Sequence, residues 1–281
     1  MRKILEWKRD SELLKKDEYC LNNNIAEKVS RLGVQEISKK YTHIPPNDIE
    51  KVLKIDSDVW DSFTGIGIDL GGGVASVSSV VAKNKNVDYL YCLEVTESTV
   101  KKCQPIIIDS ILGKNSYKVV SVIGDFNNIE LEDSTLNFVV AWDSIHHSDD
   151  VVKTLREAYR VLKNQGRMII VDRGHNNATS NKEIDRMLNV QYNKSFLKAN
   201  FLPVDKVLTR RENGEHEYRF NQWSIFFQEA GFRVLKSIIV KEKNKDNSNS
   251  VNDAGYKEIF SNFELGGYER KKVMYILAAI K

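Results

Sequence analysis

From residue 65 onward, short runs of β-branched and aromatic residues alternate with stretches that have the apolar period of a helix. This alternation is typical of a mostly parallel sheet with crossover helices packed on its faces. Strands are expected at residues 67–69, 87–93, 118–123, 137–142, 167–171, 234–240 and 273–280. The clearest helix is expected at residues 149–162, where Val151, Leu155, Ala158 and Leu162 share one face. The chain is therefore predicted to have an α/β fold.

Two segments differ in character from this alternation. Residues 1–64 are rich in Lys, Glu and Asn with spaced aliphatic residues, and they predict a helical N-terminal cap. Residues 174–222 interrupt the rhythm of the sheet and predict a lid inserted after the fifth strand. This division leaves residues 65–173 as a cofactor-binding core and residues 223–281 as its C-terminal part. Inserted lids commonly carry specificity.

Composition narrows the class of partner. Forty-two Lys and Arg residues and 39 Asp and Glu residues give a net charge of only +3, which disfavours nucleic-acid binding and favours a small-molecule acceptor. The apolar runs fall far short of the roughly 20 residues that cross a bilayer, so no membrane partner is expected. The N-terminus lacks the features of an export signal and the three cysteines are scattered, so we expect a cytoplasmic protein with reduced thiols. No oligomeric state follows from these features.

The most informative segment is a strand that runs into three consecutive glycines, Gly71, Gly72 and Gly73. Glycines let the backbone approach a ligand closely and turn sharply into a helix, so a nucleotide-like ligand is expected there. An acid, Asp69, precedes the glycines. The dinucleotide fingerprint Gly-x-Gly-x-x-Gly, counted from Gly71, would need Gly or Ala where this chain has Ser76. The spacing therefore disfavours a nicotinamide or flavin cofactor.

Two further acids follow the next two strands. Glu94 comes directly after residues 89–93, where a carboxylate can accept both hydrogen bonds of a ribose diol, and this acid fits either type of cofactor. Asp125 follows the strand at 119–123 and precedes Phe126, so that this pair can hold the edge and the plane of an adenine ring. Adjacent parallel strands would bring Asp69 and Glu94 to one rim of the sheet.

This arrangement resembles the class I S-adenosylmethionine-dependent methyltransferases over residues 65–172, and more loosely over residues 223–281. Segments 141–147 and 155–167 also match, although Asn164 and Gln165 depart from the usual Leu-Lys-Pro-Gly-Gly ending. The resemblance implies a Rossmann-like, seven-stranded, mostly parallel sheet with its last strand antiparallel, and S-adenosyl-L-methionine as the cofactor. The cofactor-binding residues that it implies, together with their neighbours, are Asp69, Gly71, Gly72, Gly73, Glu94, Val95, Asp125, Phe126, Trp142 and Asp143.

Two of these positions also have a purely structural interpretation. Trp142 is expected in the core, since large apolar side chains usually lie there. Asp143 is expected to cap the short helix that follows it.

Polar residues beyond the fourth and fifth strands and in the lid are candidates for handling the acceptor, because ligands of open α/β sheets bind at this rim. The candidate bases are His146 and His147, followed by His175 and His216. The candidate acceptor-binding residues are Arg173, Tyr218, Arg219 and, from the cap, Tyr41. The polar run at 215–219 also fits a solvated turn before a helix. No metal is expected, because no two histidines have the His-x-x-x-His spacing of a helical site.

The function expected from these features is methyl transfer to a small molecule, at an oxygen of a hydroxylated or anionic biosynthetic intermediate such as a sugar or a nucleotide-linked sugar. A hydroxyl or a protonated amine as acceptor needs a base, whereas a carboxylate or phosphate-type oxygen needs none and would be held by an arginine. Two alternatives stay open at this point: an NAD(P)-dependent oxidoreductase that uses the same glycine turn, and a non-catalytic, cofactor-binding partner subunit.

Overall fold

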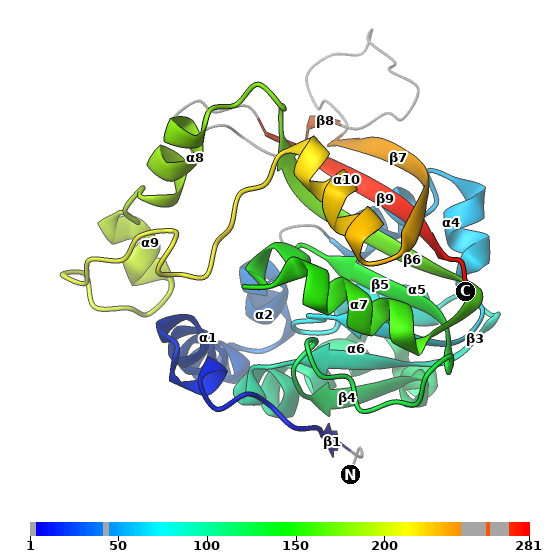
Figure 1. Cartoon of the computed structure of the whole chain (residues 1–281). Coiled ribbons are helices and arrows are strands. Elements are labelled where there is room, and N and C mark those ends of the chain that lie inside the picture. Colours follow the sequence, from blue (N-terminus) through cyan, green and yellow to red (C-terminus); the bar gives the residue numbers. More distant parts are fainter. Residues whose placement is uncertain (1–3, 42–44, 243–256, 259–269) are drawn as a thin grey trace, which may run out of the picture.

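The computed structural model describes residues 4–41, 45–242, 257–258 and 270–281. Its centre is a nine-stranded sheet in the order β1-β4-β3-β2-β5-β6-β9-β7-β8 (Figure 1). The strands are β1 (Ile4–Glu6), β2 (Gly65–Leu70), β3 (Val87–Glu94), β4 (Val119–Ile123), β5 (Leu136–Trp142), β6 (Leu162–His175), β7 (Phe232–Glu242), β8 (Lys257–Glu258) and β9 (Arg270–Ala279).

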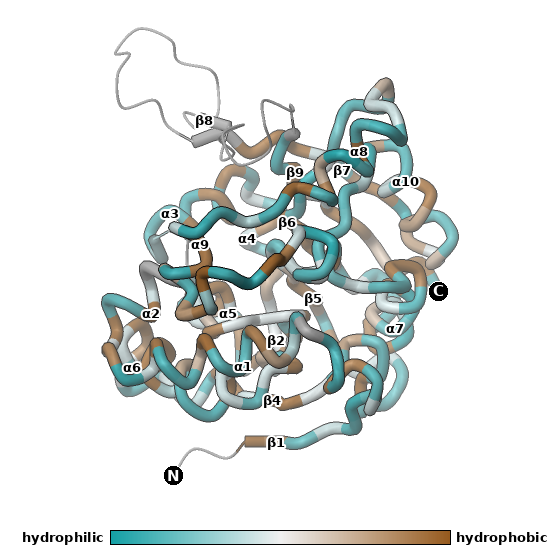
Figure 2. Tube along the Cα trace, turned by 90° about the vertical axis from the view of Figure 1, so that its left-hand side faces the viewer, coloured by the Kyte–Doolittle hydropathy of each residue, from teal (hydrophilic) through white to brown (hydrophobic). Residues whose placement is uncertain are grey.

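The sheet confirms the predicted fold class. Strands β1 to β6 pair in parallel, and β9, the last strand in the chain, runs antiparallel to both β6 and β7. The seven expected strands are all present. The strand β1 was not expected, because residues 4–6 were assigned to the helical cap. Three residues are too short to show a period in the sequence, and pairing with the edge strand β4 decides their conformation (Figure 2).

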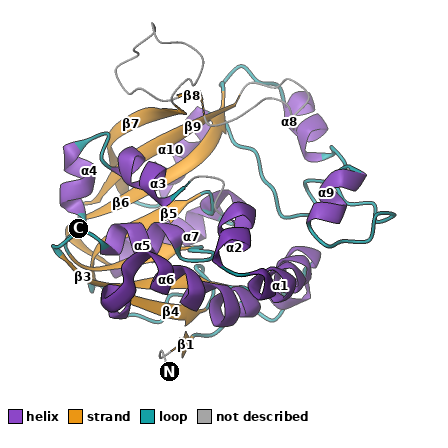
Figure 3. Cartoon of the chain, turned by 180° about the vertical axis from the view of Figure 1, so that it is seen from behind, coloured by secondary structure: helices purple, strands orange, loops and turns teal. Residues whose placement is uncertain are grey.

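Helices cover both faces of the sheet (Figure 3). One face packs against α7 (Val151–Val161) and α10 (Phe220–Glu229), and the other against α3 (Pro46–Leu53), α4 (Ser57–Ser62), α5 (Ser76–Ala82) and α6 (Gln104–Leu112). Successive strand residues alternate between the two cores, as Val139 and Val140 of β5 do. Because both faces of these strands are buried, the strands appear in the sequence as continuous apolar runs.

The cap and the lid contact each other beside the sheet. The residues assigned to the cap include α1 (Asp17–Val29) and α2 (Val34–Tyr41), and those assigned to the lid include α8 (Asn181–Leu188) and α9 (Lys194–Ala199). Leu21 of α1 packs with Leu197 and Leu208 of the lid, and Lys28 Nζ donates to the carbonyl of Phe201. In Figure 1, α1 and the lid helices α8 and α9 lie together on one side of the sheet.

Among the helices that the structure describes, none is both long and apolar enough to cross a membrane.

Candidate active site

The glycine turn lies between β2 and α5 and has the backbone that its sequence predicts. Gly71 and Gly73 have φ angles of +69° and +51°, which side chains with a Cβ rarely adopt. A Cβ on Gly71 would lie 2.5 Å from the Cβ of Ser144, whose hydroxyl donates to the Leu70 carbonyl at 2.6 Å. A Cβ on Gly73 would meet nothing within 4 Å. Ser144 therefore packs against one side of the turn, whereas the space where a Cβ of Gly73 would lie is empty of atoms of the described residues.

Asp69 lies beneath the turn and is only 1% exposed. Its Oδ2 accepts a hydrogen bond from Ser78 Oγ of α5 at 2.6 Å. Burial raises the pKa of Asp69 to about 7. An ionised carboxylate at this buried position makes the folded protein less stable at neutral pH. A residue that lowers stability in this way is expected to have a functional role.

The Asp69→Asn variant is expected to gain stability over the natural protein as the pH rises. The folded carboxyl keeps its proton up to a pH of about 7 while the unfolded one loses it near pH 4, so its contribution to stability falls across this window and stays low above it. Between pH 5 and pH 8 the gain of the variant should increase by on the order of 2 kcal/mol. Urea unfolding of both proteins at the two pH values measures it, and a pH-independent difference would contradict the burial of a charge at this position.

Glu94 lies on the other side of the glycine turn. Its Oε2 accepts from the Gly73 amide at 3.2 Å, and its Oε1 accepts from the Thr96 amide at 2.7 Å. Burial raises its pKa. A Cβ on Gly72 would lie 3.2 Å from Asp69 Oδ2. Asp69 and Glu94 therefore approach the same three-glycine segment from two adjacent strands, as the parallel pairing of β2 and β3 requires.

The next predicted cofactor residues lie along the same rim. Asp125 is buried, which raises its pKa, and it accepts from the Asn127 amide at 2.8 Å. Phe126 is half-buried against the core. The Val95 carbonyl accepts from Arg9 Nη1 at 3.1 Å, which ties the start of the chain to this edge.

Asp143 does not cap the following helix through its side chain. The short helix η5 (Ile145–His147) begins after Ser144 and has no side-chain cap, and Asp143 instead has a φ of +48° and an ion pair with Lys272 of β9. The structural interpretation of Asp143 as a cap was therefore wrong, because the positive φ turns its side chain toward β9. Its Oδ1 is buried without a partner among the described residues. The ammonium of Lys272 also lies 5.8 Å from the ring centre of Trp142, which packs against the core.

These residues fit an adenosyl sulfonium ligand. The open face at Gly73 allows a ligand to approach the backbone, and Asp143 Oδ1 is an acceptor without a partner in the described structure. Asp69, Glu94 and Asp125 supply carboxylates at three consecutive strand ends. The cofactor would be held by residues 69, 71–73, 94, 125 and 143. When bound, it would supply a methyl group carried on a sulfonium.

The best-defined acid–base pair of the site is His146 with Asp172. His146 Nδ1 lies 2.7 Å from Asp172 Oδ1, and the His146 amide donates to Asp172 Oδ2 at 3.3 Å. His146 is 2% exposed, and burial together with the Arg173 guanidinium holds its pKa well below the usual range. A proton on Nδ1, held by Asp172, leaves the lone pair on Nε2, which lies 3.8 Å from Glu215 Oε2 of the lid.

The second histidine of η5 faces the N-terminal helix. His147 Nδ1 lies 2.9 Å from Glu18 Oε1 of α1 and 3.0 Å from the Gly214 carbonyl of the lid. The rings of His146 and His147 lie with their centres 4.2 Å apart. The Nδ1 of His216 lies 2.8 Å from the His146 carbonyl. Three of the four predicted histidines therefore lie where α1, η5 and the lid meet.

His175 belongs to a buried network of charges that joins β6 to the lid. Its Nε2 lies 2.7 Å from Glu217 Oε2, and both side chains are fully buried. Arg210 pairs with Glu217, and Arg173 pairs with Glu215. This network holds the polar run 215–217 in place, so the segment is not the solvated turn that was considered as an alternative.

The other predicted acceptor-binding residues are Arg219, Tyr218 and Tyr41, and each has contacts of its own. The guanidinium of Arg219 is engaged within the lid, where it donates to the Thr179 carbonyl and to Asn181. Tyr218 packs edge-on against Trp223 and Phe226, and burial raises its pKa to about 12. Tyr41 packs with α1 and α6, and burial raises the pKa of its hydroxyl.

Two carboxylates at the site were not among the predicted residues. Glu18 stands 129 residues before His147 in the chain and has no motif around it. Glu215 had one signal, the density of polar residues from 215 to 219 ahead of an apolar helix. Both residues reach the site because the cap and the lid pack against each other.

The segment with the glycine turn and the strand-end acids resembles a known family of domains. Residues 68–170 match the family described as methyltransferase domain. No curated protein matches the chain.

Solved structures share the fold of this chain. A putative sarcosine dimethylglycine methyltransferase from Galdieria sulphuraria is 16% identical, with a TM-score of 0.55 over 82% of this chain and 84% of the other. An S-adenosylmethionine-dependent methyltransferase from Leishmania major is 14% identical, with a TM-score of 0.59 over 96% of this chain and 87% of the other. A geranyl diphosphate methyltransferase is 11% identical, with a TM-score of 0.55 over 83% of this chain and 77% of the other.

The likeness to these structures shows the fold, and the family match places a methyltransferase domain on the segment that carries Asp69, Glu94 and Asp125. Residues 68–170 therefore carry a methyltransferase domain, and S-adenosyl-L-methionine is the cofactor that such a domain implies.

Proposed function

We propose that this enzyme methylates an oxygen of a small hydroxylated molecule, such as a sugar or a nucleotide-linked sugar, bound between α1, η5 and the lid. The similar structures are named for acceptors as different as sarcosine and geranyl diphosphate, so the acceptor has to be inferred from the site of this chain. The observation that carries the proposal is the His146 imidazole, oriented by Asp172 with its Nε2 toward the lid.

A hydroxyl oxygen becomes a good nucleophile only when it loses its proton. The lone pair on His146 Nε2 can assist in two ways: it can accept that proton directly, or it can ligate a cation that acidifies the hydroxyl. Either role needs an imidazole with a fixed tautomer, which the 2.7 Å contact with Asp172 supplies. A fixed neutral imidazole therefore supports an oxygen acceptor.

Of the two acceptor types expected from the sequence, the hydroxylated one has the better support. Methyl transfer to a carboxylate or phosphate oxygen would require arginines with unused charge at the reacting oxygen. Arg173 and Arg210, the two buried arginines beside His146, are paired with Glu215 and Glu217. Their charge is therefore already balanced by carboxylates of the lid.

The chain contributes alignment and shielding to the transfer. The carboxylates of Asp69 and Glu94 would fix the two ends of the cofactor, while η5 and the lid would hold the acceptor in line with its methyl group. Alignment of this kind can supply several kcal/mol of the barrier reduction. The cap–lid contact through Leu21, Leu197 and Leu208 would keep water from the reacting atoms.

The proposal is tested with cofactor that carries a carbon-13 methyl group. The purified enzyme is incubated with a mixture of sugars, nucleotide-linked sugars, amines and carboxylic acids, and the labelled products are separated and examined by NMR. We expect a methyl ether, identified by the chemical shift of the labelled carbon. A labelled N-methyl, C-methyl or methyl ester product as the main species would overturn the proposal.

A further inference from the structure

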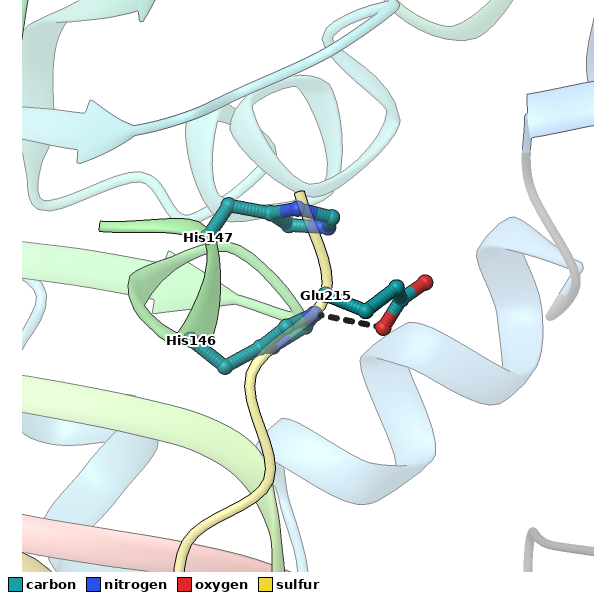
Figure 4. Close-up of side chains that lie close together, drawn as sticks. All are labelled: His146, His147 and Glu215. Atoms are coloured by element: carbon teal, nitrogen blue, oxygen red, sulfur yellow. Dashed lines mark ion pairs between the residues drawn. The ribbon is translucent and has the colours of Figure 1, made fainter. Parts of the chain in front are cut away.

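A second arrangement at this site goes beyond a histidine–aspartate pair. One ring nitrogen of His146, one of His147 and a carboxylate oxygen of Glu215 all lie within 4.8 Å of one another. Figure 4 shows both rings extending from η5 toward the lid segment that carries Glu215, with the Nε2 of His146 facing its carboxylate. We infer that these three residues form a site for a divalent metal ion of the zinc type. The inference deepens the proposed function and rests on it.

The donor set suits such an ion. Two imidazole nitrogens and one carboxylate are ligands that zinc and its neighbours in the first transition row accept, and catalytic zinc sites often use three protein ligands and keep one position open. The distance of 3.8 Å between His146 Nε2 and Glu215 Oε2 is within about 1 Å of the spacing that two ligands at roughly 2 Å from one ion would have. A small movement of the lid would close that gap.

Each of the three ligands has an outer partner. Asp172 holds His146 Nδ1, and Glu18 with the Gly214 carbonyl holds His147 Nδ1, so the lone pair of each ring falls on Nε2. Arg173 and Arg210 contact Glu215 through Oε2 and restrict its orientation. Metal-binding histidines commonly donate their second nitrogen to a carboxylate or a carbonyl in this way.

The local charge also favours a dication. Glu18, Asp172, Glu215 and Glu217 supply four carboxylates around the two histidines, whereas only Arg173 and Arg210 of the described network supply guanidiniums. When the carboxylates are ionised, two negative charges are in excess. One divalent ion balances this excess.

Another group of potential ligands nearby is less suitable. Asp143, His146 and Asp172 also lie within 4.8 Å of one another. Both oxygens of Asp172, however, already contact His146, one through Nδ1 and the other through the amide. These contacts favour the His146, His147 and Glu215 set, which borders α1 and the lid.

The open position of the ion would take the acceptor oxygen. Coordination lowers the pKa of a bound hydroxyl, so that its proton leaves to solvent while the acceptor binds, before the site is closed to water. The oxygen lone pair forms the bond to the methyl carbon, and the carbon–sulfur bond breaks with its electron pair left on sulfur. The products are a methyl ether and neutral S-adenosylhomocysteine.

Zinc binding to the whole protein tests the site. Chelator-stripped enzyme is titrated with Zn²⁺ in competition with a chromophoric chelator, and we expect one ion per chain. His146→Ala, His147→Ala and Glu215→Gln should each weaken binding on the order of 100-fold or more. Glu212→Gln is the matched control, because it removes an exposed carboxylate of the same lid loop that lies outside the cluster, and it should bind zinc as the natural protein does.

The affinity for S-adenosylhomocysteine, measured on the same samples, shows that each variant is folded. If His146→Ala does not fold, His147→Ala carries the test, because the His147 side chain is 30% exposed. The absence of one-to-one zinc binding, or binding that all three variants retain, would overturn the inference. Formation of the methyl ether by chelated enzyme would overturn it too and leave the proposed function standing, whereas a main product other than a methyl ether would overturn the proposed function.

Discussion

His146→Asn is expected to slow methyl transfer roughly 1,000-fold, within the range that loss of a proton acceptor causes. Asparagine can place an amide N–H where Nδ1 lies in histidine, so the hydrogen bond to Asp172 can persist. It has no atom at the position of Nε2, the nitrogen that faces Glu215. The decrease in rate therefore measures the contribution of Nε2 alone. The measurement is the rate of S-adenosylhomocysteine formation with the acceptor found in the labelling experiment.

Two further measurements separate a chemical role of His146 from a structural one. The affinity for S-adenosylhomocysteine and the unfolding temperature should stay close to those of the natural protein, because the buried contact with Asp172 is kept. A turnover within threefold of the natural rate would remove His146 from the reaction. If turnover fell about 1,000-fold and the affinity for S-adenosylhomocysteine fell by the same factor, the substitution would have disrupted the structure of the site rather than removed a chemical group.

The second large effect is expected at Glu94. Glu94→Ala should weaken S-adenosylhomocysteine binding roughly 1,000-fold, since two hydrogen bonds to a charged group at about 2 kcal/mol each are lost with the carboxylate. The Gly73 and Thr96 amides, which Glu94 accepts from, would also lose their partner. Isothermal titration calorimetry measures the affinity, and Glu94→Gln should fall between the two proteins because it keeps one acceptor oxygen.

Glu97→Ala is the matched control for Glu94. It removes a carboxylate three residues further along, where Glu97 pairs at the surface with Lys101, and it should leave the affinity unchanged. Titration of the natural protein with NADH should give no binding, which separates this cofactor site from that of an oxidoreductase. Unchanged affinity in Glu94→Ala would mean that the rim of β3 does not hold the cofactor.

The glycine turn and the strand-end acids could be placed from the sequence because their relation is local or periodic. Asp69 and the glycines are neighbours in the chain, and φ angles of +69° and +51° are the conformations that glycine makes accessible. Glu94 and Asp125 follow apolar runs, and parallel pairing brings the ends of such strands to one edge of a sheet.

The interpretation of Asp143 as a helix cap was wrong because a contact with a residue distant in the sequence overrides the local preference. An acid before a short helix is ordinarily a good cap. Here the antiparallel strand β9 brings Lys272 next to it, and an ion pair with a buried ammonium takes the place of the cap. The partner is 129 residues away in the chain and no period connects the two positions.

By itself, the sequence determined the α/β alternation, the position of the glycine turn and the acids at the ends of neighbouring strands, because backbone sterics and strand periodicity act over a few residues. Only the tertiary structure decided that Glu18 of α1 and Glu215 of the lid would meet the histidines of η5. That meeting depends on apolar packing between two distant segments, through Leu21, Leu197 and Leu208. Apolar packing is non-directional, so it requires no fixed spacing of residues in the sequence. The sequence therefore could not predict that Glu18 and Glu215 would lie beside the histidines.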